Sequence, residues 1–259
     1  MIAKPGRCRT SSGDPSFDRL GENSRRILAH VSRYQLTTPE VLRRLFFPQD
    51  TEALKTPMKT LRGRYLATEP LFPGAPKEAL YYHLTPKAQG LLKLPEKFGN
   101  PIPLERRVHL YAVLLFCTAG KEPRPLFTLE EFRRVFPMVS FETGGAGRFY
   151  SRSYYLDVDE AGERRLGRIL VDEGAKVESL LEKCGKAFEA AEIELPLFVA
   201  ERRFALAVVT PAPEKRRALE RELRRNPIGP PLEPVRVTVS VIPELAHLQM
   251  AKESTRGAA

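Results

Sequence analysis

The sequence predicts an α+β fold built from two domains. Three observations predict it: short helical patterns followed by an extended segment in the first hundred residues, a proline-containing stretch around Gly99, and alternating strand and helix patterns after that stretch. The chain has 259 residues, 42% of them hydrophobic, which is enough for two modest domains with buried cores. We expect a flexible basic tail at 1–20, domains at 21–98 and 99–250, and a second tail at 251–259.

Positive charge is concentrated in the first domain and its tail. Residues 1–98 contain 17 Lys and Arg against 9 Asp and Glu, a net charge of +8. Residues 99–259 contain 25 against 23, a net charge of +2. An excess of positive charge favours an anionic partner, and its location predicts that the first domain binds DNA.

Three helical patterns open the first domain. The apolar residues of the first recur at helical spacing: Ile27, Leu28, Val31 and Tyr34. Thr38 is a good N-cap with Pro39 at the first helical position of the second helix. Thr56 and Pro57 repeat that start signal, so we expect the third helix at 57–63.

An extended segment follows the three helical patterns. Residues 65–67 and 79–84 read as the two strands of a hairpin, with prolines and Gly74 between them, and Thr85-Pro86 opens another helix. Three helices followed by a hairpin is the order of a winged helix-turn-helix, which places one helix in the DNA major groove. The sequence therefore predicts that the helix at 57–63 is a recognition helix.

The expected DNA-binding residues lie on and around that helix: Lys55, Thr56, Lys59, Thr60, Arg62, Arg64 and Lys77. Lys and Arg contacts to phosphates supply affinity but little sequence information. Thr56, Lys59 and Thr60 are the expected base readers, because the N-terminal part of a recognition helix reaches base edges. The alternative is a solvated basic helix face, which the charge distribution and the element order disfavour.

The second domain alternates strand and helix patterns, which predicts an α/β layer with some parallel pairing. Thr128 and Glu131 form a capping-box pattern. An apolar stripe marks the longest expected helix, and it either packs on the sheet or supplies a symmetric dimer interface. The expected elements are helices at 104–117, 163–191 and 213–225, and strands at 148–158, 204–209 and 235–241.

No motif in the chain announces a catalytic or metal site. Cys8, Cys117 and Cys184 are far apart, which predicts a reducing cytoplasm and no zinc site. The four histidines lack metal-ligand spacing, and neither a phosphate-binding glycine loop nor a nucleophile elbow is present. No apolar run approaches about 18 residues, and 1–19 do not read as a signal peptide. We expect a cytoplasmic protein without enzyme activity, cofactor or metal.

Four segments of the chain match a known pattern: Leu36-Thr37-Thr38, Leu61-Arg62, the run from Tyr81 to Ala88, and Tyr155-Leu156-Asp157-Val158-Asp159. In these segments the chain resembles the replication-relaxation family of plasmids and other mobile elements. Proteins of that family join a winged helix to an α/β domain that looks like a restriction-endonuclease core. The resemblance spans most of 22–245 and implies a role in transcription or replication control.

A metal-dependent nuclease of that fold needs an acidic residue on one strand, then an acidic residue and a lysine two positions apart on the next. Met138 stands where the first carboxylate is expected, and Asp159 stands in place of the lysine after Asp157. The resemblance therefore implies a degenerate nuclease-like core without cleavage activity.

The preferred interpretation is a sequence-specific protein that binds double-stranded DNA, with the second domain serving dimerisation or partner binding. One alternative is an endonuclease or nickase with Asp157, Asp159 and Glu142 as metal ligands, which the missing lysine disfavours. The other is an adaptor whose winged helix binds protein, which the charge of the first domain disfavours.

Overall fold

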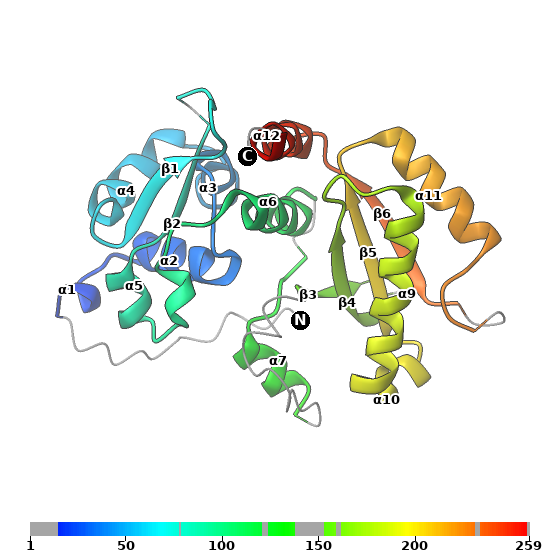
Figure 1. The fold of residues 1–259 in the computed structure, drawn as a ribbon. Coiled ribbons are helices and arrows are strands. Elements are labelled where there is room, and N and C mark those ends of the chain that lie inside the picture. The colour runs from blue at the N-terminus through cyan, green and yellow to red at the C-terminus, as the bar shows by residue number, and fades with distance from the viewer. Residues whose placement is uncertain are drawn as a thin grey trace. The chain divides into compact units, whose positions relative to one another are not determined.

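The computed structural model describes residues 15–77, 79–120, 124–137, 153–158, 162–230 and 234–257. Helices and two separate sheets make up the chain, which confirms the predicted α+β class (Figure 1). The chain divides into two compact units, Met1–Ile102 (unit 1) and Pro103–Ala259 (unit 2). The division falls slightly beyond the boundary expected after residue 98.

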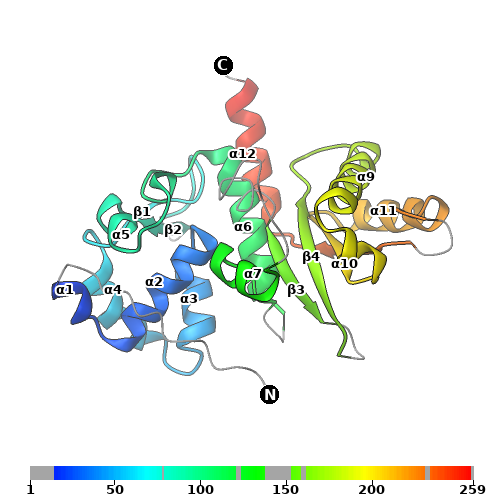
Figure 2. The same ribbon diagram turned by 90° about the horizontal axis from the view of Figure 1, so that it is seen from below.

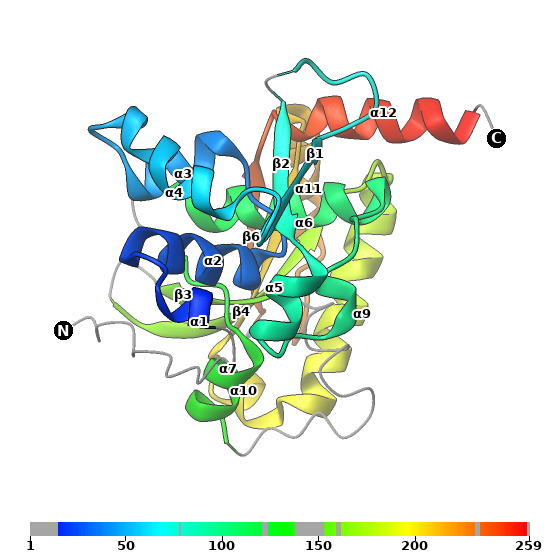
Figure 3. The same cartoon turned by 90° about the vertical axis from the view of Figure 1, so that its left-hand side faces the viewer.

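Unit 1 is helical apart from one antiparallel hairpin, and Figure 3 gives a view of its three main helices and the hairpin. Its elements are α1 (Pro15–Asp18), α2 (Glu22–Tyr34), α3 (Pro39–Phe46), the 3-10 helix η1 (Thr51–Leu54), α4 (Lys55–Leu61), β1 (Leu66–Pro70), β2 (Leu80–Leu84), α5 (Pro86–Leu91) and the 3-10 helix η2 (Glu96–Phe98).

Local capping explains where the helices of unit 1 begin. Thr38 caps α3 as predicted, because its hydroxyl accepts a hydrogen bond from the amide of Val41 at 3.3 Å. The expected cap at Thr56 is wrong. Asp50 instead accepts from the amides of Glu52 and Ala53 at 3.0 and 3.2 Å, so η1 begins at Thr51 and leads directly into α4.

The end of the third helix also differs from the prediction of 57–63. Helix α4 ends at Leu61, and Arg62 has extended dihedral angles of −60° and 141°. Gly63 follows with a φ of 72°, a left-handed conformation that suits glycine and turns the chain toward β1. Arg62 therefore lies at the helix end rather than on its face.

The hairpin is tied to the helices through a third extended segment. Leu66 pairs with Leu84 and Pro70 with Leu80 at the two ends of the β1–β2 ladder. Thr37, between α2 and α3, adds a single antiparallel bridge to Tyr82, with N–H···O distances of 3.0 and 2.8 Å. The hairpin, α2 and α3 therefore form one packed body.

The tail expected at 1–20 is partly wrong. Residues 15–18 form α1, and both Phe17 and Leu20 are buried. The Phe17 ring meets Tyr65 edge-on at 6.0 Å, which fixes this segment on unit 1 because two aromatic side chains gain by leaving water together. Residues 1–14 lie outside the described part of the chain.

Unit 2 contains a four-stranded sheet in the order β3-β4-β5-β6. The β3–β4 pair is antiparallel, whereas β4–β5 and β5–β6 are parallel, as the alternation of strands and helices predicted. Its elements are α6 (Leu104–Thr118), α7 (Leu129–Val135), β3 (Tyr154–Val158), β4 (Arg164–Val171), α9 (Val177–Glu194), α10 (Pro196–Ala200), β5 (Phe204–Thr210), α11 (Pro213–Arg225), β6 (Arg236–Val241) and α12 (Leu245–Gly257).

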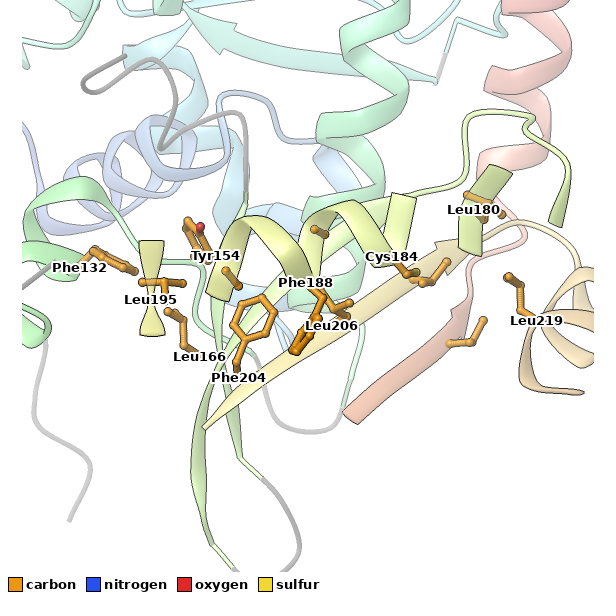
Figure 4. Packing of buried hydrophobic residues seen from close by; sticks show 14 of the residues in the cluster. Phe132, Tyr154, Leu166, Leu180, Cys184, Phe188, Leu195, Phe204, Leu206 and Leu219 are labelled. Atoms are coloured by element: carbon orange, nitrogen blue, oxygen red, sulfur yellow. The ribbon is translucent and has the colours of Figure 1, made fainter. Parts of the chain in front are cut away.

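Helices cover both faces of this sheet. Figure 1 and Figure 2 show α9 and α11 on one face and α6 with α12 on the other. Figure 4 shows Cys184 and Phe188 of α9 packed near Leu206 of β5, within a cluster that also includes Leu219 of α11. All seven residues of β5 are buried, as expected for a central strand with both faces covered.

The long helix expected at 163–191 is wrong over its first part. Residues 164–171 form β4, and α9 begins at Val177. Gly167 allows the Tyr155 ring to lie against β4, since a Cβ there would be 2.1 Å from the ring. The apolar stripe of α9 packs on the sheet, so a dimer interface on that stripe is also wrong.

The prediction of a second tail at 251–259 is wrong as far as Gly257, because helix α12 continues to that residue. Lys252 of this helix is buried, and its ammonium lies 3.3 Å from a carboxylate oxygen of Glu173. The strand expected at 148–158 is described from residue 153 onward, where β3 confirms it. Within the described residues no helix combines the length and apolar content needed to span a membrane.

Candidate nucleic-acid interface

An open groove of about 840 Å³ lies in unit 1 between α3, η1, α4 and β2. Four basic side chains and one carboxylate line it, so its local charge is positive. Its floor is apolar and aromatic. The lining residues are Pro39, Arg43, Glu52, Leu54, Lys55, Met58, Lys59, Arg62, Leu80 and Tyr82.

Arg62 is held against the floor of this groove. Its Nη2 donates a hydrogen bond to the hydroxyl of Tyr82, and its guanidinium carbon lies 5.1 Å from the centre of the Tyr82 ring. Tyr82 itself is only 2% exposed. The contact uses one of the five N–H donors of Arg62, which is exposed and lines the groove.

The other cations of the groove are held less tightly. Lys55 forms an ion pair with Glu52 in which both side chains are more than two-thirds exposed, so the pair contributes little stability. Arg43 and Lys59 are exposed and have no ion-pair partner among the described residues. The groove therefore presents charge that the described fold does not neutralise, which suits a polyanion.

The structure brings together three of the seven predicted residues on this groove: Lys55, Lys59 and Arg62. Thr56 and Thr60 are exposed on α4 but do not line it. The remaining two lie elsewhere on unit 1.

Arg64 and Lys77 do not belong to the groove. Arg64 lies over the ring of Tyr65 at 5.3 Å, a ring that it shares with Lys87 at 5.9 Å. Lys77 is exposed in the loop between β1 and β2. Neither side chain lines the groove.

Sequence reasoning missed Arg43 and Tyr82. Arg43 lies on α3 one turn after Pro39, and its signal was an arginine on the polar side of an amphipathic helix. Tyr82 lies in a strand in which both faces are buried, so alternation along the sequence does not show which of Tyr81 and Tyr82 faces α4.

Desolvation lowers the pKa of one histidine in each unit, His30 and His109. Burial, helped by Arg33, lowers the pKa of His30 to about 3, and its Nε2 lies 3.0 Å from the Thr37 hydroxyl. Burial also lowers the pKa of His109, against an opposing effect of Glu173, whose carboxylate is 4.0 Å away. His30 is buried, whereas the His109 side chain is 24% exposed, and neither lines the groove.

The carboxylates named for a nuclease do not assemble into a site within the described residues. Asp157 is buried on β3, with Oδ2 4.0 Å from Nε of Arg236 and no hydrogen-bond partner for that oxygen in the described chain. Met138, Glu142 and Asp159 lie outside the described residues. Among those described, no three His, Cys, Asp or Glu side chains gather where they would hold a metal ion.

Sequence reasoning also missed a polar network at the carboxyl ends of β4 and β5. Asp172 is fully buried, and its Oδ2 accepts from the Thr210 hydroxyl at 2.9 Å and from the Lys215 ammonium at 2.8 Å. Its Oδ1 accepts from the amides of Gly174 and Ala175 at 3.0 and 3.1 Å. Both oxygens are thus used in holding the turn after β4 to α11.

Burial shields the two cysteines of the described residues from reaction. Cys117 and Cys184 are buried and not bonded to each other, and burial raises the pKa of the Cys184 thiol to about 11. Cys8 lies outside the described residues.

Comparisons with protein-family models, curated proteins and solved structures find no match. The chemistry of the groove therefore follows from its own residues.

Proposed function

We propose that this chain is a sequence-specific protein that binds double-stranded DNA through unit 1. The observation that carries the proposal is the groove beside α4, which gathers Arg43, Lys55, Lys59 and Arg62 around one carboxylate. Unit 1 also holds nearly all of the excess positive charge of the chain. A concentrated positive surface attracts the DNA backbone over the range of the Debye length.

The element order of unit 1 supports a winged-helix mode of binding. Helices α2 and α3 precede η1–α4, the hairpin follows, and Thr37 adds a single antiparallel bridge to the hairpin. In such an arrangement η1–α4 enters the major groove and the hairpin acts as the wing. The loop that carries Lys77 would then lie on the flanking backbone.

This mode gives the basic and hydroxyl side chains different tasks. Arg43 and Arg62 contact phosphates, because guanidinium groups bind phosphate oxygens in pairs. Thr56, Lys59 and Thr60 are exposed along α4 and face base edges. Affinity then depends steeply on salt, with a slope of about −0.9 for each phosphate neutralised.

The biological role that we propose is control of transcription or replication in a plasmid or other mobile element. It rests on the segments that resemble the replication-relaxation family, with unit 2 as a degenerate, non-cleaving core that serves dimerisation or partner binding. One recognition helix reads only a few base pairs, too few to define a unique site. A dimer on a two-fold-related site meets that need.

The test compares two double variants of the full chain on DNA selected by the parent from a random library. Lys59→Ala with Arg62→Ala removes two charges from the groove. Arg133→Ala with Arg134→Ala removes two exposed charges from α7 in unit 2 and is the charge-matched control.

We expect the groove variant to bind roughly 10- to 100-fold more weakly, with the salt slope reduced by about one unit for each phosphate that the variant no longer neutralises. The control should bind like the parent. Equal binding by the groove variant and the parent would refute the proposal. An equally weakened α7 variant would show that net charge alone, not the groove, drives binding.

A further inference from the structure

We infer that Tyr82 is a positioning residue that fixes the guanidinium of Arg62 for one DNA phosphate. The inference rests on the proposed function of the groove and adds a residue that acts through another. Arg62 is the only one of the four groove cations to show a hydrogen bond from its charged group to a buried aromatic side chain of the described residues.

Both ends of the Arg62 side chain are restrained. At the backbone, its amide donates to the carbonyl of Met58 at 2.9 Å, which fixes it at the end of α4. At the tip, Nη2 donates to the Tyr82 hydroxyl while the guanidinium lies over the ring of the same residue. An arginine ordered before binding gives up less conformational freedom when it contacts a phosphate.

The Tyr82 hydroxyl is itself a fixed point. The residue is 2% exposed. Its amide donates a hydrogen bond to the Thr37 carbonyl, and its carbonyl accepts one from the Thr37 amide. The Thr37 hydroxyl in turn lies 3.0 Å from Nε2 of the buried His30 on α2. The position of Arg62 is thus set by a connected series of contacts that runs back to α2.

Tyr81 provides a control one residue away. It is also fully buried, but it points to the opposite face of β2, where its hydroxyl donates to Glu69 at 2.7 Å. Replacing either tyrosine by phenylalanine removes one hydroxyl that makes a hydrogen bond to a charged group. Only Tyr82 contacts a cation of the groove.

The experiment measures DNA affinity of the full-length Tyr82→Phe and Tyr81→Phe variants on the selected DNA, with thermal unfolding recorded for each. We expect Tyr82→Phe to weaken binding roughly five- to tenfold, because the unrestrained Arg62 side chain then loses its rotamer freedom when it contacts the phosphate. Tyr81→Phe should stay within about twofold of the parent.

A double-mutant cycle separates positioning from a general effect on folding. Because Tyr82 acts through Arg62, Tyr82→Phe should cost nothing further in an Arg62→Ala background. Unchanged affinity of Tyr82→Phe, or the same weakening with and without Arg62, would overturn the inference. If Arg62→Ala alone binds like the parent, it is the proposed contact of Arg62 with DNA that fails, not only its positioning by Tyr82.

Discussion

The two units use their charged side chains in different ways. Unit 2 is nearly neutral, and two of its buried charged residues are ion-paired, Asp172 with Lys215 and Lys252 with Glu173. Unit 1 has a net charge of +8, and within the described residues Arg43 and Lys59 remain unpaired at its groove. Paired charges hold a fold together, whereas an unpaired cluster at a groove is available to a partner.

This contrast separates stability from binding. The Asp172 network joins the turn after β4, the end of β5 and α11, so its removal should destabilise unit 2 without touching the groove. Lys55 contributes little to the fold, since its exposed ion pair is worth about 0–1 kcal/mol, and Arg43 and Lys59 show no ion pair among the described residues. Variants in each unit should therefore change one property and leave the other unchanged.

The largest expected effect is on the stability of unit 2. Asp172→Ala removes the acceptor of the Thr210 hydroxyl and the anionic partner of the Lys215 ammonium, which keeps only the Ala175 carbonyl, and breaking such a pair typically costs about 3–5 kcal/mol. We expect Cys117 and Cys184, which are buried in unit 2, to become reactive at a lower urea concentration. The measurement is thiol labelling along a urea titration.

Glu201→Ala is the control for this variant, since it removes only the exposed ion pair with Arg203. It should leave the labelling midpoint almost unchanged. DNA affinity measured below the unfolding transition should be the same for all three proteins. Weaker DNA binding by folded Asp172→Ala would break the separation between the two units.

The next effect is a pH dependence located in unit 1. The pKa of His30 is about 3 in the folded chain and near 6.5 when unfolded, so between these values only the unfolded chain takes up the proton. The stabilisation that comes from keeping His30 neutral is fully present above pH 6.5. Below that pH the free energy of unfolding falls by about 1.4 kcal/mol for each pH unit. His30→Gln should flatten that slope while an amide remains near Thr37.

Circular dichroism along urea titrations between pH 7 and pH 4 gives the slope for each protein. The matched control is His247→Gln, because His247 is exposed on α12. The free energy of unfolding of His247→Gln should change with pH as that of the parent does. If His30→Gln retains the full slope, acid sensitivity does not come from the buried histidine of unit 1.

Capping and apolar patterns predicted much of the fold because they act over a few residues. The capping box at Thr128 and Glu131 is confirmed by hydrogen bonds of 3.0 and 3.2 Å, and α11 covers the predicted range 213–225. Strand β4 was missed because Leu166 and Leu170 are four apart, a spacing that shares one face in a helix and also in a strand. Gly167 was the residue that argued against the helix, because glycine is unfavourable within helices.

The candidate site was predicted only in part because a groove depends on which elements meet. Lys55, Lys59 and Arg62 follow from one helix, so local sequence grouped them. Arg43 joins them from α3 and Tyr82 from β2, and such contacts between separate elements depend on tertiary packing. The Asp172 network escaped for the same reason, since its partners are 38 and 43 residues away.

The smallest expected effect is the absence of any change in supercoiled plasmid incubated with the protein and Mg²⁺ or Mn²⁺. A nuclease of the type considered needs carboxylates from two strands around a metal and a group that activates water. Asp157 instead lies 4.0 Å from the Arg236 guanidinium, a cation beside the very carboxylate that a metal would need. Residues two apart in a strand point to the same face of the sheet. Asp157 and Asp159 would therefore share a face only if the strand continued through Asp159. We expect the parent and Asp157→Asn to leave the plasmid supercoiled alike, as judged on agarose gels. Nicking by the parent that disappears in Asp157→Asn would give unit 2 a catalytic role and end the division of tasks between the units.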